Sequence, residues 1–159
     1  METSSLKYWF HKILQSKISL KGCSRYVALC YHYLRENKKS DPFPRILGNS
    51  IDEFYSHIKM LQKNYDVISL KDALSISTGK DEFNKKNTGI LLTFDDGLSD
   101  HYTAAKILSE LGISGTFFVP TCILDEQLPA NPTIIHYGVA VFGIEGFLKE
   151  FRQILANQR

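Results

Sequence analysis

Apolar residues along the chain follow two spacings, and the alternation between them predicts the fold. Four short apolar runs are expected to be strands, and they lie at residues 26–33, 65–68, 89–92 and 113–120. The intervening segments place apolar residues three or four positions apart, as helices with one buried face do, at residues 51–64, 70–76 and 98–111. Strands that alternate with helices favour a parallel sheet or barrel. We therefore expect an α/β fold with about four parallel strands and flanking helices.

The predicted helix ends carry their own signals. Ser50 and Glu53 form the capping-box pattern that starts a helix, and Ser69 starts the next one. Gly112 is the residue type that ends a helix. After an irregular stretch with two prolines, the C-terminal region should form two helical pieces, residues 134–142 and 143–157.

Residues 6–20 predict a basic amphipathic helix that charged residues interrupt too often for a secretory signal. We expect this helix to pack against the domain, with weak contact to a membrane surface as the alternative. The expected organisation is the helix at residues 1–20 and one α/β domain, the N-terminal part of a barrel, at residues 21–159.

Composition and charge exclude several classes of protein. With 159 residues, 43% hydrophobic and 23% charged, the chain has the composition of a folded domain rather than a disordered segment. The net charge of +2 and the scattered basic residues do not indicate a nucleic-acid partner. No apolar run is long enough to form a transmembrane segment. The three cysteines lack metal-type spacing and are expected to be reduced thiols in a cytoplasmic protein.

The strongest candidate for chemistry is the pair Asp95 and Asp96, which follows the third apolar run and precedes Gly97. Carboxylates beside a core are poorly tolerated without partners. The carboxyl ends of parallel strands are also where α/β proteins carry out chemistry. A divalent metal is the partner that best suits two crowded acids. The alternative is an Asp-Gly turn that closes a hairpin, and the helical spacing after Gly97 argues against it.

The residues from Thr93 to Gly97, followed by a helix and then by Gly115-Thr116-Phe117-Phe118-Val119, resemble the polysaccharide deacetylases of carbohydrate esterase family four. Tyr31-His32 and residues 65–70 support the resemblance, which covers about residues 26–124. It implies an irregular (β/α) barrel, of which this chain would be the N-terminal part. It also implies hydrolysis of N-acetyl or O-acetyl groups on a carbohydrate, in surface-glycan metabolism.

The resemblance assigns roles to particular residues. Asp95 would be the general base that removes a proton from the attacking water. Asp96 would be a ligand to a divalent metal, commonly zinc. Gly97 would let the backbone turn closely beneath the site. His32, at the end of the first strand, is a candidate substrate-binding residue, with a hydrogen-bonded structural histidine as the alternative.

The histidines depart from the family pattern. The family completes its metal site with two histidines four residues apart, whereas no two of the five histidines here lie three or four apart. Only His101 and His136 follow Asp96, and neither is expected to be a ligand. His101 is expected in solvent or in the first turn of a helix. A single carboxylate falls short of the three protein ligands of a hydrolytic zinc site.

These departures predict a truncated deacetylase that is inactive alone, with uncovered barrel edges that favour association. The main alternative is a non-catalytic remnant or binding module that keeps half of the scaffold. A phosphorelay receiver domain also places paired acids after a strand. It begins with that strand, however, and needs a lysine after a later strand, which this sequence lacks.

Overall fold

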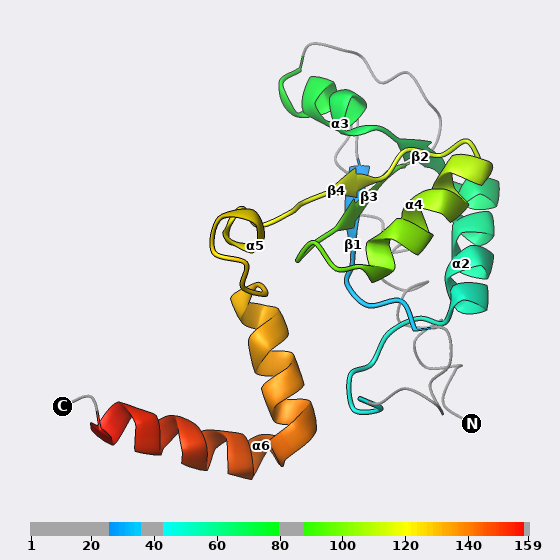
Figure 1. The fold of residues 1–159 in the computed structure, drawn as a ribbon. Coiled ribbons are helices and arrows are strands. Elements are labelled where there is room, and N and C mark those ends of the chain that lie inside the picture. The colour runs from blue at the N-terminus through cyan, green and yellow to red at the C-terminus, as the bar shows by residue number, and fades with distance from the viewer. Residues whose placement is uncertain (1–25, 36–42, 80–87, 158–159) are drawn as a thin grey trace.

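The computed structural model describes residues 26–35, 43–79 and 88–157 (Figure 1). The predicted N-terminal helix at residues 6–20 lies outside these ranges. Within them, strands and helices alternate as the spacing predicts, around a parallel sheet. None of the described helices combines the length and the apolar character that a bilayer span requires.

The sheet has four parallel strands, which confirms the expected architecture. They are β1 (Tyr26–Tyr31), β2 (Asp66–Ile68), β3 (Gly89–Phe94) and β4 (Thr116–Phe117). β1 pairs with β3 along its full length, from Tyr26 beside Gly89 to Tyr31 beside Phe94. β2 and β4 therefore share the opposite edge of β3, with β2 along its first half and β4 along its last two residues. Every residue of β3 is buried, so this strand is the centre of the fold.

Helices cover the two faces of the sheet unequally. α2 (Ile51–Asn64) and α4 (Asp100–Glu110) lie side by side on one face (Figure 1). There they form the main core with the side chains of Phe54, Ile58, Leu61, Ile90, Leu92, Phe94, Ala104 and Leu108. α3 (Leu70–Ser77) covers the other face, where Ala73 packs against Ile68 and Leu91. Because successive strand residues point to opposite faces, β3 contributes side chains to both cores, with Ile90 and Leu92 on one face and Leu91 on the other.

The second face is open at the carboxyl end of β1. Ala28 lies beside Leu91, and Cys30 lies beside Thr93. Side chains of directly paired residues point to the same face. Ala28 and Cys30 are both exposed, so no described element covers this part of the face.

The predicted helix starts are confirmed. Ser50 and Ser69 each accept a hydrogen bond from a backbone N–H three residues later, at Glu53 and Asp72. The carboxylates of these two acids accept hydrogen bonds from the serine backbone N–H groups in return, which completes two capping boxes. Gly112 follows the end of α4 with a φ of 65°, as a residue that ends a helix does.

The last strand is much shorter than the sequence predicts. The apolar run predicts a buried strand over residues 113–120, whereas β4 contains only Thr116 and Phe117. Phe118 and Val119 are 51% and 54% exposed. The reason is that β4 pairs with β3 on one edge, while no described strand pairs with its outer edge. Pro120 also lacks the N–H that would extend the ladder.

After the short helix α5 (Cys122–Asp125), the C-terminal region forms α6 (Asn131–Asn157), which bends at Gly143 with a φ of 71°. The bend lies where the sequence predicts a boundary between two helical pieces. The first piece contacts the rest of the protein through His136, which hydrogen-bonds the Tyr33 hydroxyl at 2.9 Å.

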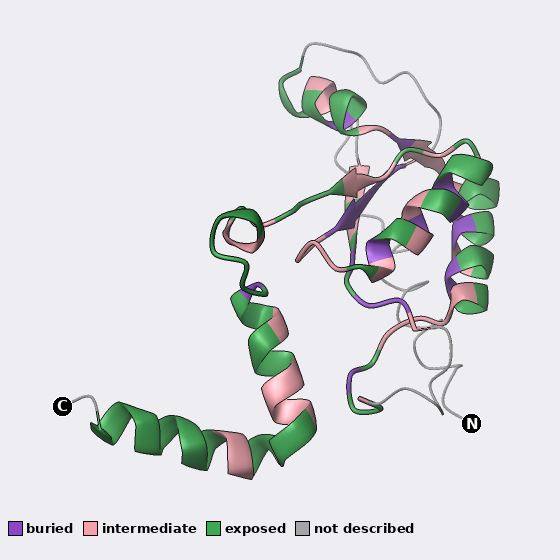
Figure 2. Ribbon diagram, in the orientation of Figure 1, coloured by how far each residue is buried: buried purple, intermediate pink, exposed green. Residues whose placement is uncertain are grey.

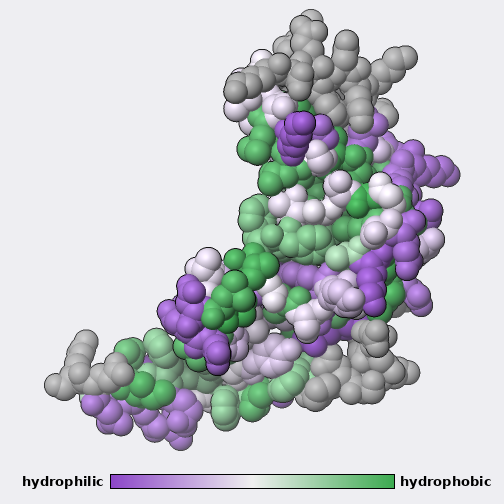
Figure 3. Space-filling model, turned by 45° about the horizontal axis from the view of Figure 1, so that its top comes forward, coloured by the Kyte–Doolittle hydropathy of each residue, from purple (hydrophilic) through white to green (hydrophobic). Residues whose placement is uncertain are grey.

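α6 has no buried residue (Figure 2). Its bare apolar side chains include Phe142, Ile144, Leu148, Phe151 and Ile154. Figure 3 shows hydrophobic side chains both on the body of the protein and on the arm that α6 forms. Apolar surface of this extent is typical of a face that another polypeptide covers.

His101 connects α4 to the end of β1. It lies in the first turn of α4, one of its two expected positions, but its side chain is only 6% exposed. Its Nε2 hydrogen-bonds the backbone carbonyl of His32 at 2.8 Å, and its ring packs edge-on against Phe94. The expectation of a solvent-exposed His101 is therefore wrong, because the ring fills core space and satisfies a backbone carbonyl.

Replacing His101 should destabilise the chain. His101→Leu leaves the His32 carbonyl without its partner, which should lower the free energy of unfolding by about 1–3 kcal/mol. Urea denaturation followed by circular dichroism measures this change. Ser109→Ala, at an exposed position of the same helix, should change stability by less than about 0.5 kcal/mol. Equal effects of the two substitutions would contradict a structural role for the His101 bond.

His57 should make stability depend on pH. Burial lowers the pKa of His57 below its ordinary value of 6.5, and its Nδ1 hydrogen-bonds the Tyr31 hydroxyl at 2.9 Å. Below about pH 6.5 the unfolded chain therefore binds a proton that the folded chain does not, so stability falls as the pH drops toward the folded-state pKa.

His57→Gln should remove this contribution. The loss of urea resistance between about pH 7.5 and about pH 5 should be smaller in His57→Gln than in the wild type. Lys59→Gln, on the exposed side of the same helix, should keep the wild-type pH dependence. An unchanged pH dependence in His57→Gln would exclude His57 as its source.

Candidate active site

The pairing of β1 with β3 places the residues that follow these two strands next to each other at the carboxyl end of the sheet. Tyr31 lies beside Phe94, so His32 and Asp95 are the next residues along the two neighbouring strands. The Asp95 N–H donates a hydrogen bond to the Tyr31 carbonyl at 3.2 Å, which continues the ladder by one residue. His32 and Asp95 are thereby positioned at the edge where α/β folds place their chemistry.

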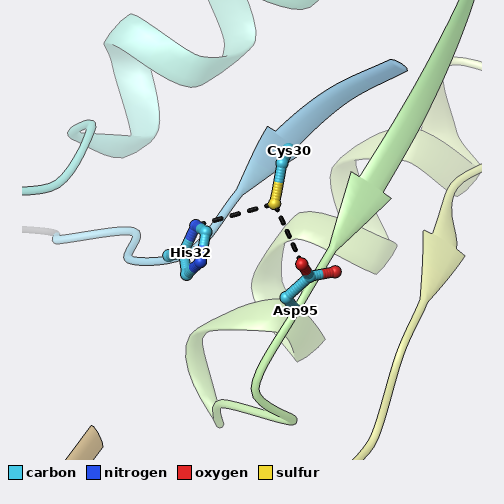
Figure 4. A group of neighbouring side chains, drawn as sticks. All are labelled: Cys30, His32 and Asp95. Atoms are coloured by element: carbon cyan, nitrogen blue, oxygen red, sulfur yellow. Dashed lines mark hydrogen bonds between the residues drawn. The ribbon is translucent and has the colours of Figure 1, made fainter. Parts of the chain in front are cut away.

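Three side chains converge on the open face of the sheet at this edge. Cys30 and His32 are two residues apart and point to the same side, and Asp95 faces them from the neighbouring strand (Figure 4). The Cys30 thiol donates a hydrogen bond to Asp95 Oδ2 at 3.2 Å. The Cys30 sulfur also lies 3.7 Å from His32 Nδ1. The structure therefore brings Asp95 and His32 into one cluster.

Asp96 joins this cluster from the turn that follows. Its φ of 74° is in the left-handed region, which few non-glycine residues adopt and which Asp tolerates better than most. Its Oδ2 lies 3.9 Å from His32 Nε2, so the pair is an ion pair only when the imidazole is protonated. Among the described residues this oxygen is buried without a hydrogen-bond partner. Burying a carboxylate oxygen without a partner costs free energy, because the oxygen loses its hydrogen bonds to water.

Gly97 makes the close turn that the sequence predicts. Its φ is 60°, which favours glycine. A Cβ at this position would lie 3.1 Å from both Ile123 Cδ1 and Val119 Cγ1. The turn beneath the acids therefore favours glycine, because a side chain here would be strained by the positive φ and would force Ile123 and Val119 to shift.

The remaining described histidines do not hydrogen-bond the side chains of the cluster. His101 hydrogen-bonds the backbone of His32 and so supports the site from within the core. His136 hydrogen-bonds the Tyr33 hydroxyl, and His57 hydrogen-bonds the Tyr31 hydroxyl. Each of these three imidazoles uses one ring nitrogen for a hydrogen bond to another part of the described chain.

Sequence reasoning missed Cys30. The spacing between the three cysteines gave no sign of a site, but Cys30 and His32 alternate on a strand, and this signal could have placed them on one face. Partial desolvation raises the pKa of the Cys30 thiol, and the hydrogen bond to Asp95 raises it further. The thiol is therefore protonated in the metal-free protein at neutral pH.

The groups around Asp96 have the chemistry of a cation site. A divalent cation would offset the burial of the partnerless Asp96 oxygen, and His32 Nε2 is an imidazole donor on the same side. Carboxylate and imidazole are both ligand types that zinc accepts. Two ligands are, however, fewer than the three protein ligands of a catalytic zinc site.

The chain was compared with family models, curated proteins and solved structures, and only solved structures are similar to it. No family model and no curated protein matches the chain. Among solved structures, the chain is similar to a de-N-acetylase from Aggregatibacter actinomycetemcomitans, with a TM-score of 0.52 and 26% identity over 64% of this chain. It also matches a polysaccharide deacetylase from Bacillus cereus, with a TM-score of 0.46 and 24% identity over 60% of this chain and 29% of that one.

The chain spans 40% of the length of the de-N-acetylase. The described part of this chain contains a parallel sheet with flanking helices, as the spacing of apolar residues predicts. The chain is therefore similar in fold to part of a de-N-acetylase, in agreement with the resemblance that residues 93–97 and 115–119 indicate.

Proposed function

We propose that the chain is part of a metal-dependent carbohydrate deacetylase, in which Asp95 is the general base and Asp96 binds a divalent metal, zinc by preference. The observation that carries this proposal is the buried Asp96 Oδ2, which has no hydrogen-bond partner in the described part of the chain. A second carboxylate and a histidine accompany it at the strand ends. The fold match to a de-N-acetylase supports deacetylation over other metal-assisted hydrolyses.

Asp95 and His32 have positions that suit their proposed roles. A metal held by Asp96 would polarise the acetyl carbonyl and lower the pKa of a bound water. The Asp95 carboxylate lies on the open face of the sheet, where it can accept the proton of the water that attacks the acetyl carbon. The His32 side chain is 44% exposed, so its ring can hydrogen-bond a sugar hydroxyl when Nε2 is not bound to the metal at Asp96.

In this proposal, Asp96 supplies one metal ligand and further polypeptide supplies the others. His101 and His136 each hydrogen-bond another group, so the ligands that complete the site at Asp96 are assigned outside the described residues. The isolated chain should accordingly have very low activity. Its bare apolar faces on β4 and α6 would associate with that further polypeptide. A cytoplasmic location is part of the same proposal.

A non-catalytic binding module is the second candidate. The observation that favours it is that His101 and His136, the two histidines after Asp96, both hydrogen-bond groups other than Asp96. A module of this kind would bind a carbohydrate at the same strand ends without releasing acetate. Binding and turnover measured on the same oligosaccharide separate the two candidates.

Zinc should stabilise the chain through Asp96. In a Cys30→Ser background, which removes a competing thiol, zinc should raise the thermal unfolding temperature, and Asp96→Asn should abolish this effect. At a zinc concentration of about 100 times Kd, the linkage relation gives roughly 2.7 kcal/mol of added stability. Asn tolerates the positive φ of 74° at this position, so the substitution removes charge without straining the turn.

Circular dichroism as a function of temperature measures this stabilisation. Asp125→Asn, at an exposed position in α5, is the matched control and should keep the full zinc response. A zinc response of equal size with and without the Asp96 carboxylate would contradict its role as a ligand.

Any deacetylase activity of the chain should depend on Asp95. Acetate release from N-acetylglucosamine oligomers, measured with the metal-loaded chain, should be low and should fall by roughly 10²–10⁴ in Asp95→Asn. Asp125→Asn should leave the rate unchanged. Acetate release that survives Asp95→Asn would exclude Asp95 as the base. Oligosaccharide binding with no release in the wild type would favour the binding module.

A further inference from the structure

The Cys30 thiol lies inside the candidate site, yet the proposed deacetylation does not use it. Cys30, His32 and Asp95 each present one ligand atom, and these atoms all lie within 4.8 Å of one another (Figure 4). Thiolate, imidazole and carboxylate together form a ligand set typical of zinc and of other thiophilic divalent metals. This set differs from the site at Asp96, because it centres on the sulfur and includes the other carboxylate.

The distances within the set are close to those of a tetrahedral site. At zinc bond lengths of about 2.3 Å to sulfur and about 2.0–2.2 Å to nitrogen and oxygen, tetrahedral ligands lie roughly 3.3–3.6 Å apart. The Cys30 sulfur lies 3.2 Å from Asp95 Oδ2 and 3.7 Å from His32 Nδ1. His32 and Asp95 present their ligand atoms within 4.8 Å of each other, so these two side chains would have to move closer together to share one ion with the sulfur.

The second ring nitrogen of His32 points toward a carboxylate. His32 Nδ1 faces Cys30, so Nε2 carries the proton when Nδ1 binds a metal, and Nε2 lies 3.9 Å from Asp96 Oδ2, which is longer than a hydrogen bond. A metal-bound histidine usually donates its other N–H to a carboxylate, which fixes the ring orientation. Asp96 would fill this role for a metal held by the other three residues.

The backbone that carries the three ligands is held on both strands. Cys30 pairs with Thr93 in the sheet, and the Asp95 N–H bonds the Tyr31 carbonyl. The His32 carbonyl accepts the hydrogen bond from His101. Ligand atoms on a fixed backbone lose little freedom when a metal binds, which favours binding.

We propose that Cys30, His32 and Asp95 form a second binding site for a thiophilic divalent metal such as zinc. On binding, the Cys30 thiol releases its proton to solvent and the sulfur–metal bond replaces its hydrogen bond to Asp95. The metal then occupies the Asp95 carboxylate, so that excess zinc inhibits deacetylation. This last consequence rests on the proposed function, whereas the binding does not.

Titration with Co²⁺ tests the site, because cobalt bound to a thiolate gives a charge-transfer absorption band in the near ultraviolet. The wild-type chain, Cys122→Ser and Cys23→Ser should all show the band, and Cys30→Ser should lack it. Zinc should displace cobalt and remove the band, whereas excess Mg²⁺ should not. Loss of the His32 or Asp95 ligand, in His32→Gln or Asp95→Asn, should weaken cobalt binding at least about tenfold, and Asp96→Asn roughly 10- to 100-fold.

A wild-type chain without the band, or a band that persists in Cys30→Ser, would overturn the proposal. Far-ultraviolet circular dichroism checks that each variant is folded, and Asp95→Asn provides a second test if Cys30→Ser is not. The stabilisation by zinc through Asp96 is measured without Cys30. If the cobalt band is absent but zinc still stabilises the chain through Asp96, only the proposed site at Cys30, His32 and Asp95 is contradicted. If the cobalt band is present but zinc does not stabilise the chain through Asp96, only the proposed site at Asp96 is contradicted.

Discussion

The parallel pairing of β1 with β3 is the constraint on which the site depends. The register runs without a break from Tyr26 beside Gly89 to Tyr31 beside Phe94. It places Cys30, His32 and Asp95 at one edge and on one face of the sheet. A slip of one residue would turn Cys30 and His32 toward the face that α2 and α4 cover. The burial of Ile90 and Leu92 on that face opposes such a slip, so the core specifies the geometry of the cluster.

The elements with the clearest spacing could be predicted from the sequence. α2 has its apolar residues on one stripe and a capping box at Ser50, and both features form as expected. β3 is a continuous apolar run with a turn signal directly after it, so its position and its burial were predictable. Gly143 marks the bend in α6 because a glycine accommodates the positive φ at low cost. In each case the local pattern and the tertiary environment agree.

The features that could not be predicted depend on neighbours distant in the sequence. The run at residues 113–120 reads as a buried strand, but its burial requires a partner on the outer edge of β4. His101 is polar and follows a loop, and only the packing of α4 against β1 shows that it lies in the core. The proximity of the acids to His32 follows from the register of β1 on β3, which apolar spacing does not specify. The roles of Asp95 as the general base, of Asp96 as a metal ligand and of His32 in substrate binding stay predictions.

The hydrogen bond from His101 to the His32 carbonyl links the imidazole at the strand ends to the packing of a helix on the far face of the sheet. A core substitution that displaces α4 would weaken the hydrogen bond that supports the His32 backbone. Screens for loss of function would then score interior positions such as Ala104 and Leu108 alongside the polar cluster. Separating the two groups requires comparing how well each variant folds with how well it binds metal.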